Sequence, residues 1–341
     1  MGIKVLTVED STLIRLIINN TIKDMEGVDL VGTAENGQVA LEKIKELKPD
    51  IITLDLVMPV MNGIETLKQL RKFTDIPVII LSSRNDMRTT IEALELGAQD
   101  FLTKPESISR NKAEFKQDLE ATFKALVQSN QSLPKTSKKV EKVTKQQPKQ
   151  HNEIKEVEAI VIGASTGGPK MLTALIQTLP SNLSIPIFIV QHMPAGFTAS
   201  FAKRLNTLSN VSVVEAEHNM TVEPGTVYLA PGGRHMVIKG HRIKLLDTEK
   251  VHSVKPAIDP MFHSAIEVYG GNILAVIMTG MGRDGAQGCV EVKNAGGYVI
   301  AQDEATSVVY GMPKSAVETG AVDEILSIDA IINEINKQIE G

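Results

Sequence analysis

Residues 50–83, DIITLDLVMPVMNGIETLKQLRKFTDIPVIILSS, decide the fold of the first part of the chain. Two short runs rich in Val, Ile and Leu, DIITLDL and PVIILSS, flank the amphipathic segment GIETLKQLRK. Strands of this composition separated by a helix indicate a parallel sheet with helices on both faces. The stretch therefore predicts a β-strand, an α-helix and a second, parallel β-strand.

The same alternation extends in both directions from this stretch. Strand KVLTV begins at Lys4, and Ser11 caps a helix in which four residues recur at helical spacing: Leu13, Leu16, Ile17 and Asn20. Strand DLVGTA and helix QVALEKIKEL follow. Beyond residue 83 come helix RTTIEALELG, strand DFLTK and a last helix that we expect to end near Gln128. We predict the α/β class, with a flavodoxin-like (βα)5 domain over residues 1–128.

Polar side chains follow four of these strands, at the point where each strand ends: Glu9 and Asp10, Asp55, Ser82 and Ser83, and Lys104. The carboxyl ends of strands in an open parallel sheet line one crevice, so we expect these side chains to meet. Clustered carboxylates repel one another, and hard oxygen ligands in this number suit Mg²⁺. A lysine and a hydroxyl beside a metal-bound carboxylate are what a phosphoryl group on it requires. Each acid alone could cap a loop or a helix, but the complete set favours a phosphorylation site.

The motifs VEDS, LDLVMPVMNG, LSS and FLTKP resemble the receiver domain of bacterial response regulators over residues 1–125. The resemblance implies that a histidine kinase is the phosphodonor for Asp55 and that Mg²⁺ is the cofactor. The implied metal ligands are Glu9, Asp10, Asp55 and the Val57 carbonyl. Three further residues have implied roles: the switch hydroxyl of Ser82, the aromatic switch residue Phe101 and the phosphate contact Lys104. Glu9 stands where many receivers have an aspartate, which changes only the reach of that ligand.

Length and composition limit the number of domains and the classes of function that the chain can have. At 341 residues it exceeds a typical domain of roughly 150 residues, so we expect two domains. The net charge of −5 argues against a cationic nucleic-acid binder, and the one cysteine, Cys289, cannot form an intramolecular disulfide. No apolar stretch reaches the ~20 residues of a membrane span, and the N-terminus lacks a signal-peptide pattern. We expect a cytoplasmic protein without membrane insertion and without a nucleic-acid partner.

Residues 129–155 have a different character, with two prolines, many lysines and scarcely any apolar periodicity. A basic patch for nucleic acid or an acidic membrane is one interpretation, but the lysines lack interleaved aromatic residues. We favour a flexible linker, which leaves residues 156–341 as the second domain. Its strands, EAIVIGA, PIFIVQ, VSVVEA, TVYLA and NILAVIM, predict a mostly parallel α/β sheet. The alternating segment HMVIKGHRIKLL predicts an attached antiparallel hairpin.

Three candidate catalytic residues follow strands of the second domain. Residues 163–167, GASTG, have the spacing of a nucleophile elbow, a sharp turn that presents the hydroxyl of Ser165. Such a turn also suits a dinucleotide phosphate, but the next strand ends in Gln191-His192 instead of the acid that a ribose requires. Asp284 lies in the loop TGMGRDGA after NILAVIM, where a helix cap is the alternative role. Together the three supply a nucleophile, a base and an orienting acid.

The motifs GASTGGP, QHMP, APGGRHM, TGMGRDGA and GMPKSA resemble the catalytic domain of chemotaxis protein-glutamate methylesterases, the CheB family. The resemblance implies hydrolysis of glutamate γ-methyl esters on methyl-accepting chemotaxis receptors, and commonly deamidation of receptor glutamines, with no cofactor for the hydrolase. It implies Ser165 as nucleophile, His192 as base and Asp284 as its orienting acid.

The same resemblance assigns supporting roles. It implies that the Met281 backbone N–H is the oxyanion donor, that Thr166 holds His192, and that the unphosphorylated receiver covers the catalytic cleft. Four residues are implied to border that cleft, His235 in a structural role: Gly232, Gly233, Arg234 and His235. Two other classes stay open on the sequence: a serine hydrolase for another acyl group, and a non-enzymatic regulator with a DNA-binding output. No helix-turn-helix pattern supports the regulator.

Overall fold

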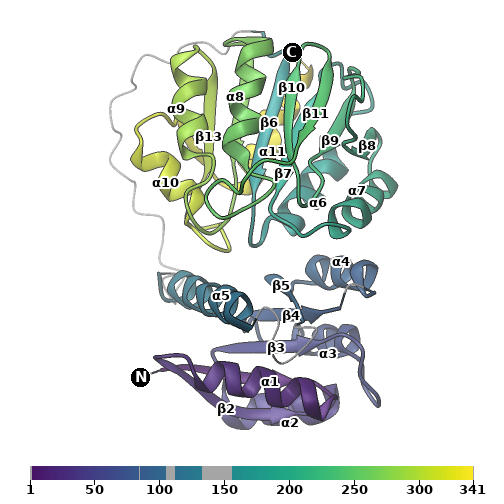
Figure 1. Ribbon diagram of the computed structural model, residues 1–341, viewed down its shortest axis with the longest axis vertical. Helices are drawn as coiled ribbons and strands as arrows, with labels where there is room; N and C mark the ends of the chain where they lie inside the picture. Colours follow the sequence, from purple (N-terminus) through teal and green to yellow (C-terminus); the bar gives the residue numbers. More distant parts are fainter. Residues whose placement is uncertain (1, 84, 105–111, 133–155, 341) are drawn as a thin grey trace.

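The structure is a computed structural model that describes residues 2–83, 85–104, 112–132 and 156–340 (Figure 1). It contains two α/β units, the N-terminal one below and the C-terminal one above in Figure 1. Most of the predicted linker, residues 133–155, lies outside the described residues. In the part of the chain that is described, no helix combines the length and hydrophobicity needed to cross a bilayer.

The N-terminal unit is a five-stranded parallel sheet in the order β2-β1-β3-β4-β5, which confirms the predicted (βα)5 architecture. Its elements are β1 (Ile3–Val8), α1 (Thr12–Lys23), β2 (Val28–Ala34), α2 (Gly37–Leu47), β3 (Ile51–Asp55), α3 (Gly63–Leu70), β4 (Val78–Ser82), α4 (Met87–Glu95), β5 (Asp100–Thr103) and α5 (Lys112–Ser132). Short polar side chains start three of the helices: Ser11, Asn36 and Asn62 each accept a hydrogen bond from a backbone N–H of the first turn.

Two details of this unit differ from the sequence-based prediction. Helix α5 continues to Ser132 instead of ending near Gln128, because no helix breaker precedes Pro134. The helix predicted after Ser11 is present, but Leu13 and Leu16 are exposed, and its buried apolar residues are Ile17, Ile18 and Ile22.

The C-terminal unit is a seven-stranded sheet in the order β14-β13-β12-β6-β7-β9-β8, with every strand pair parallel. Its elements are β6 (Ala159–Ala164), α6 (Gly168–Thr178), β7 (Ile187–Gln191), α7 (Phe197–Leu208), β8 (Ser212–Glu215), β9 (Thr226–Leu229), β10 (His235–Lys239), β11 (Arg242–Leu246), α8 (Ile258–Tyr269), β12 (Ile273–Ile277), α9 (Ala286–Asn294), β13 (Tyr298–Gln302), α10 (Met312–Glu318), β14 (Glu324–Leu326) and α11 (Ile328–Glu340). Strands β10 and β11 form the predicted antiparallel hairpin. Strands β13 and β14 were not among the predicted strands.

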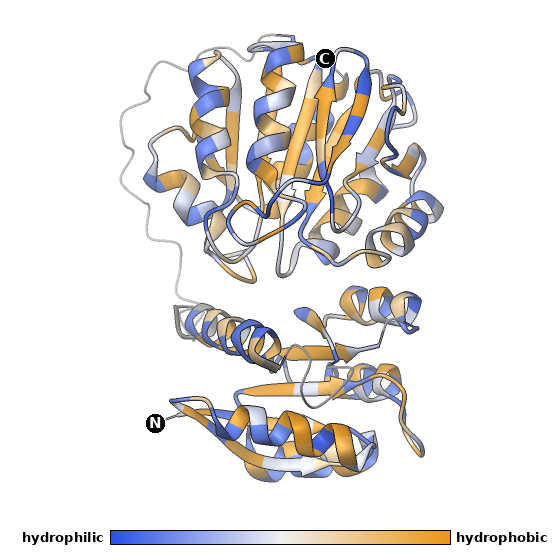
Figure 2. Ribbon diagram, viewed as in Figure 1, coloured by the Kyte–Doolittle hydropathy of each residue, from blue (hydrophilic) through white to orange (hydrophobic). Residues whose placement is uncertain are grey.

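Both sheets are covered by helices, and Figure 2 shows their strands largely in the hydrophobic colour while the helices carry both colours. Every residue of β6, β7 and β12 is buried. Such strands form the rigid centre from which the loops at their carboxyl ends project.

In each sheet, two neighbouring central strands are followed by connections that run in opposite directions across the sheet. These strands are β1 and β3 in the N-terminal sheet, and β6 and β12 in the C-terminal sheet. Ligands of open α/β sheets bind outside the carboxyl ends of such a pair of strands. Glu9, Asp10 and Asp55 follow the first pair of strands, and Ser165 and the loop with Asp284 follow the second.

Candidate active site and phosphorylation site

Ser165 lies in the tight turn between β6 and α6. Its backbone N–H donates to the Thr279 carbonyl at 3.0 Å, so the turn is fixed to the loop after β12. Gly167 has φ of 80°, and a Cβ there would lie 2.5 Å from the Val308 side chain. Only glycine meets both conditions at this position. The turn leaves Ser165 partly exposed above the buried end of β6.

His192 follows β7 and is hydrogen-bonded to Asp284. The distance from His192 Nε2 to Asp284 Oδ2 is 2.8 Å, and the Asp284 side chain is 3% exposed. The first two backbone N–H groups of α8, those of Ile258 and Asp259, donate to the same carboxylate at 2.7 and 3.2 Å. Burial favours a raised pKa for Asp284, but the bonds from His192 and the two amides outweigh it, so the pKa is lowered. Asp284 therefore stays ionised beside the imidazole.

The bond from Nε2 to Asp284 leaves Nδ1 as the His192 ring nitrogen that can serve Ser165. Among the described residues, the Ser165 hydroxyl has no hydrogen-bond partner, so the bond between nucleophile and base is not formed in this structure. Catalytic bonds of this kind often tighten only when substrate is present. Of the predicted triad, the bond between His192 and Asp284 is formed. Ser165 lies at the same edge of the sheet but is not hydrogen-bonded to His192.

Met281 and Thr166 are the two predicted supporting residues of the site. Met281 is half-buried in the loop after β12, and none of the described residues accepts a hydrogen bond from its backbone N–H. That N–H is therefore available to a ligand. The Thr166 hydroxyl donates to Asp100 of the N-terminal unit, so the predicted contact between Thr166 and His192 is not formed here. His235 is buried, and its ring nitrogens contact the Glu249 carbonyl and the Ala257 N–H, in line with a structural role.

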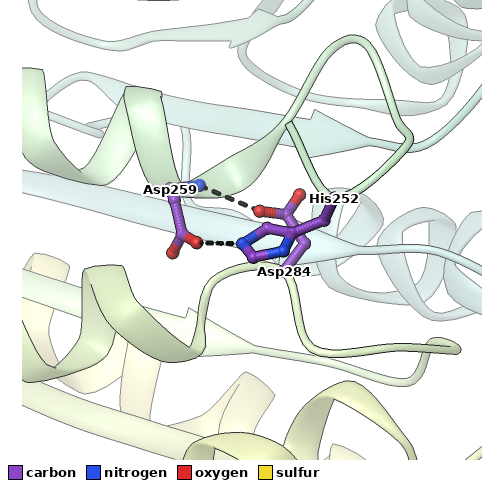
Figure 3. Close-up of side chains that lie close together, drawn as sticks. All are labelled: His252, Asp259 and Asp284. Carbon is purple, nitrogen blue, oxygen red and sulfur yellow. Dashed lines mark hydrogen bonds and ion pairs between the residues drawn. The ribbon is translucent and has the colours of Figure 1, made fainter. Parts of the chain in front are cut away.

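A second histidine and a second carboxylate adjoin Asp284 (Figure 3). His252 Nε2 lies 2.9 Å from Asp259 Oδ2, and one polar atom of each of His252, Asp259 and Asp284 lies within 4.8 Å of the others. The other Asp259 oxygen accepts from the Gly288 N–H of α9 at 2.7 Å. Because every one of these carboxylate oxygens already accepts a hydrogen bond, the cluster is a set of helix caps that ties α8 to α9, and its donors do not form a free metal site.

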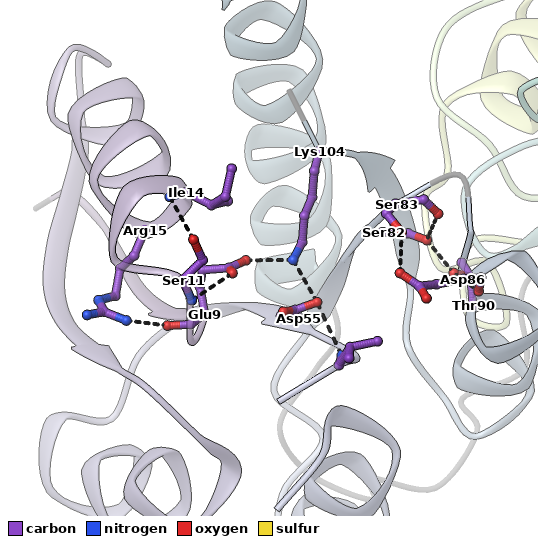
Figure 4. A network of polar contacts seen from close by, with 11 residues as sticks. Glu9, Ser11, Ile14, Arg15, Asp55, Ser82, Ser83, Asp86, Thr90 and Lys104 are labelled. Atoms are coloured by element: carbon purple, nitrogen blue, oxygen red, sulfur yellow. Dashed lines mark hydrogen bonds and ion pairs between the residues drawn. The ribbon is translucent and has the colours of Figure 1, made fainter. Parts of the chain in front are cut away.

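The predicted phosphorylation residues converge at the carboxyl edge of the N-terminal sheet (Figure 4). Lys104 Nζ lies 2.7 Å from Asp55 Oδ1 and 2.8 Å from Glu9 Oε2. One carboxylate oxygen of each of Glu9, Asp10 and Asp55 lies within 4.8 Å of the others. Burial raises the pKa of Asp55 and of Glu9, whereas their ion pairs outweigh burial at Lys104 and raise its pKa. Three converging carboxylates with only one lysine fit a hard divalent cation.

The two predicted switch residues lie on the side of this pocket toward the C-terminal unit. The Ser82 hydroxyl is 2.6 Å from Thr90 Oγ1 of α4 and donates to the Ser83 carbonyl, so it does not bond Asp55 (Figure 4). Phe101 is buried, and its ring centroid lies 4.5 Å from that of Phe197 in the C-terminal unit. Ser82 therefore bonds α4, and Phe101 packs against the C-terminal unit.

Comparison with known proteins identifies both units. The CheB methylesterase family model matches residues 160–335, and the response regulator receiver domain model matches residues 5–116. A protein-glutamate methylesterase/protein-glutamine glutaminase of Clostridium acetobutylicum is 43% identical over 99% of this chain and 98% of its own length. The chain belongs to the CheB methylesterase family.

Two further comparisons agree with this family assignment. A protein of the same name from Pyrococcus abyssi is 41% identical over 99% of this chain and 94% of its own. The crystal structure of the Thermotoga maritima CheB methylesterase catalytic domain is 45% identical, covers 54% of this chain and 98% of that chain, and has a TM-score of 0.52. The N-terminal unit is thus the receiver domain, and the C-terminal unit is the CheB methylesterase domain.

The receiver domain contacts the methylesterase domain at the nucleophile turn itself. The Thr166 hydroxyl donates to the Asp100 carboxylate, and the Gly167 N–H donates to the Gln99 carbonyl at 3.1 Å. Helices α4 and α5 and strand β5 form this face of the receiver (Figure 1). Sequence reasoning missed Asp100 and Gln99, because a polar pair at the start of a strand gives no sign of a partner 66 residues away in a separate domain.

Apolar and ionic contacts extend the interface on both sides of the turn. Val309 of the methylesterase domain belongs to the same buried apolar cluster as Phe115 and Leu119 of α5. At the other end, Arg204 of α7 forms a two-point ion pair with Glu95 of α4, at 2.8 and 2.9 Å. The receiver domain therefore lies across the carboxyl edge of the methylesterase sheet, next to Ser165.

Proposed function

We propose that this chain is a phosphorylation-regulated hydrolase that removes methyl groups from glutamate γ-methyl esters of chemotaxis receptors and also deamidates receptor glutamines. The observation that carries the proposal is the hydrogen bond between His192 and the buried Asp284, at the sheet edge that also presents Ser165. We assign Ser165 as nucleophile, His192 as general base and acid, Asp284 as the orienting carboxylate and the Met281 N–H as oxyanion donor. The names of the full-length relatives support the substrate class.

The ester reaction proceeds in two balanced steps. Ser165 Oγ bonds to the ester carbonyl carbon while His192 Nδ1 takes the hydroxyl proton, and the Met281 N–H stabilises the oxyanion. The intermediate then breaks its bond to methoxide, which receives the proton from His192 and leaves as methanol. Water adds to the acyl-enzyme with His192 again as base, which releases the glutamate carboxylate and restores the serine. A glutamine side chain follows the same path and releases ammonia.

In the receiver domain we assign Asp55 as the residue that accepts a phosphoryl group from a histidine kinase. Glu9, Asp10, Asp55 and the Val57 carbonyl would hold Mg²⁺, which supplies charge neutralisation for phosphoryl transfer. Lys104 already contacts Asp55 and is placed to bind the transferred phosphoryl oxygens. The three converging carboxylates support this assignment.

We further propose that the closed arrangement in Figure 1 is the inhibited state of the unphosphorylated enzyme. A receptor helix needs an open edge around Ser165. The two residues after Ser165, Thr166 and Gly167, are hydrogen-bonded to Asp100 of β5 and to Gln99, which precedes β5. Phosphorylation would draw Ser82 from Thr90 toward Asp55 and free Phe101 to turn away from Phe197. A change of a few kcal/mol in docking energy would open a tethered domain of this kind.

The inhibitory role of the receiver domain predicts two results. A fragment from Val157 onward should hydrolyse methyl esters faster than the unphosphorylated full-length chain, because it lacks the receiver domain. The solved catalytic domain of Thermotoga maritima, which spans the matching part of the chain, indicates that such a fragment folds alone. Full-length Asp55→Ala should have the low activity of the unphosphorylated enzyme and should not respond to a small phosphodonor.

Both proteins are measured by methanol release at equal concentration, with circular dichroism to verify folding. Asp50→Ala, which changes an exposed receiver carboxylate outside the pocket, is the matched control and should respond to phosphodonor normally. A fragment no more active than the unphosphorylated parent would remove the inhibitory part of the proposal and leave phosphorylation as a positive activator only.

Asp100 makes domain closure dependent on pH. Its carboxylate has no cationic partner among the described residues, and burial raises its pKa from 3.8 to about 6. The closed state therefore binds a proton more tightly than the open state, so closure is strongest below pH 3.8 and weakens as pH rises through about 6. The shift allows up to about a 100-fold change in the closing equilibrium.

The measurement is the activity of the unphosphorylated full-length chain divided by that of the 157–341 fragment, from pH 5 to pH 8. Division by the activity of the fragment removes the pH dependence of the catalytic step itself, which both proteins share. The ratio should rise with pH in the wild type. In Asp100→Asn, whose amide oxygen can still accept from Thr166, the ratio should rise much less with pH than in the wild type. A wild-type ratio that falls with pH would show that another group controls closure.

A further inference from the structure

Gln191, the last residue of β7, connects the predicted nucleophile and base through their backbones. Its side chain is 2% exposed, and its Nε2 donates to the Ser165 carbonyl at 2.9 Å and to the His192 carbonyl at 3.1 Å. The amide nitrogen of this buried side chain is therefore bonded to the backbones of both Ser165 and His192. The backbone strengthens the same connection, since the His192 N–H donates to the Ala164 carbonyl at 3.0 Å.

We propose that Gln191 is a positioning residue for ester hydrolysis, which holds the backbones of Ser165 and His192 at a fixed separation. The inference rests on the proposed function, because it takes Ser165 and His192 as the reacting pair. Gln191 Nε2 bonds the backbone carbonyls of the reacting pair and not their side chains, so it acts through the two residues that it links.

The donor pattern at this position requires an amide. Two carbonyl oxygens face Gln191 Nε2, and the two N–H bonds of a carboxamide satisfy both. Gln191 Oε1 is buried and has no hydrogen-bond partner among the described residues. An unpartnered buried acceptor costs about 1–3 kcal/mol, so the side chain is not optimised for stability alone. The two donations and the position beside the reacting pair account for a polar residue here.

The shape of the nucleophile turn matches this side chain. A Cβ on Gly168 would lie 2.1 Å from Gln191 Oε1, so a side chain at position 168 would displace the amide. Gly168, the third glycine of GASTGGP, therefore leaves the space in which the Gln191 amide lies. Gly167, in contrast, is required for its own backbone conformation.

The link matters because Ser165 and His192 lie on different strands and are not hydrogen-bonded to each other in this structure. A misplacement of about 1 Å between reacting groups costs about 100-fold in rate. The parallel bonds between β6 and β7 fix the strands up to Ala164 and Gln191. Beyond that point, the Gln191 amide joins the turn at Ser165 to the turn at His192.

The test uses two variants of the full-length chain, each supplied with Mg²⁺ and a small phosphodonor. Gln191→Met keeps the length of the side chain and removes both donors. Gln191→Glu keeps the shape and replaces the donating nitrogen by an acceptor oxygen that faces two carbonyls. Both should lower kcat for methyl-ester hydrolysis by about 10- to 100-fold, with KM within about twofold of wild type. The rate at which a fluorophosphonate probe labels Ser165 should fall by a similar factor.

Tyr228→Phe is the matched control, because it also removes hydrogen bonds between a buried side chain and two backbone groups. The Tyr228 hydroxyl bonds the Glu223 N–H and the Thr221 carbonyl, at the opposite end of its strand from the active site. Its loss should lower the melting temperature and leave kcat within about twofold. A structural role for Gln191 alone would give the same pattern as this control, with a lower melting temperature and unchanged kcat, and would overturn the inference.

The remaining outcomes separate this inference from the proposed function. If the wild type releases methanol from methylated receptor and Gln191→Met does so at a similar kcat, the positioning role is wrong and the function stands. A loss confined to KM also contradicts the positioning role. If the wild type releases no methanol, but the Gln191 variants slow probe labelling of Ser165, the substrate is wrong and the positioning role stands.

Discussion

Ser165→Ala is expected to lower methyl-ester hydrolysis by about 10⁴-fold or more. Triad residues act as a unit, so the loss of the nucleophile leaves only the contributions of substrate binding and the oxyanion donor. The serine hydroxyl has no hydrogen-bond partner among the described residues, so its removal breaks no contact of the fold. The variant should therefore be as stable as wild type and should still be phosphorylated on Asp55.

The measurement is methanol release by the phosphorylated chain, together with a melting curve and phosphate incorporation. Ser181→Ala, at an exposed serine remote in sequence from the turn, is the matched control and should retain full activity. Near wild-type turnover in Ser165→Ala would show that the nucleophile lies elsewhere.

Asp284→Asn is expected to lower kcat by about 10³- to 10⁴-fold while KM changes little. In the structure Asp284 accepts from His192 Nε2, which keeps Nδ1 free of its proton and able to accept one from Ser165. An asparagine can donate to Nε2 instead, which places the proton on Nδ1 and removes the base. The lowered pKa of Asp284 means that this carboxylate is ionised across the neutral range, so its effect on the wild-type pH profile is confined to acid.

Asp284 also caps α8, so part of the loss could come from the fold. Asp259→Asn is the matched control, because Asp259 belongs to the same cluster of helix caps but does not contact His192 (Figure 3). It should reduce stability to a similar extent and leave kcat within a few-fold of wild type. A loss in Asp284→Asn that appears only in KM, or that Asp259→Asn reproduces, would make Asp284 a structural cap.

The position of both sites was predictable because it depends on local signals. Glu9, Asp55, Ser165 and His192 each follow a buried apolar strand, and the rule for open parallel sheets then brings them to one edge. The hairpin β10-β11 was predictable from alternation around Lys239-Gly240.

Other features depended on packing that no local pattern records. The predicted face of α1 included Leu13 and Leu16, which are exposed. Helical spacing shows that apolar residues line one side of a helix, but it does not show which side packs against the sheet. Strand β14 has only three residues, which weakens its signal. Strand β13, in contrast, is a buried run of five residues, as long as β7 and β12, and its local pattern was sufficient to predict it.

The contacts between the domains were the least accessible to sequence reasoning. Thr166 was expected to hold His192, and in the closed arrangement its hydroxyl instead bonds Asp100 of the receiver domain. That bond depends on how two separately folded units dock, which neither unit's own pattern determines.

The central claim is that phosphorylation of Asp55 controls methyl-ester hydrolysis at Ser165. One measurement tests it most directly: methanol release from a purified, methylated chemotaxis receptor by the full-length chain, with and without a small phosphodonor and Mg²⁺. The account predicts slow release without phosphodonor and release at least about tenfold faster with it, because an effect on docking of 1.4 kcal/mol or more is about tenfold in an equilibrium. Absence of methanol under both conditions, while the chain still hydrolyses other esters, would contradict the substrate, and equal release under both would contradict the control by Asp55.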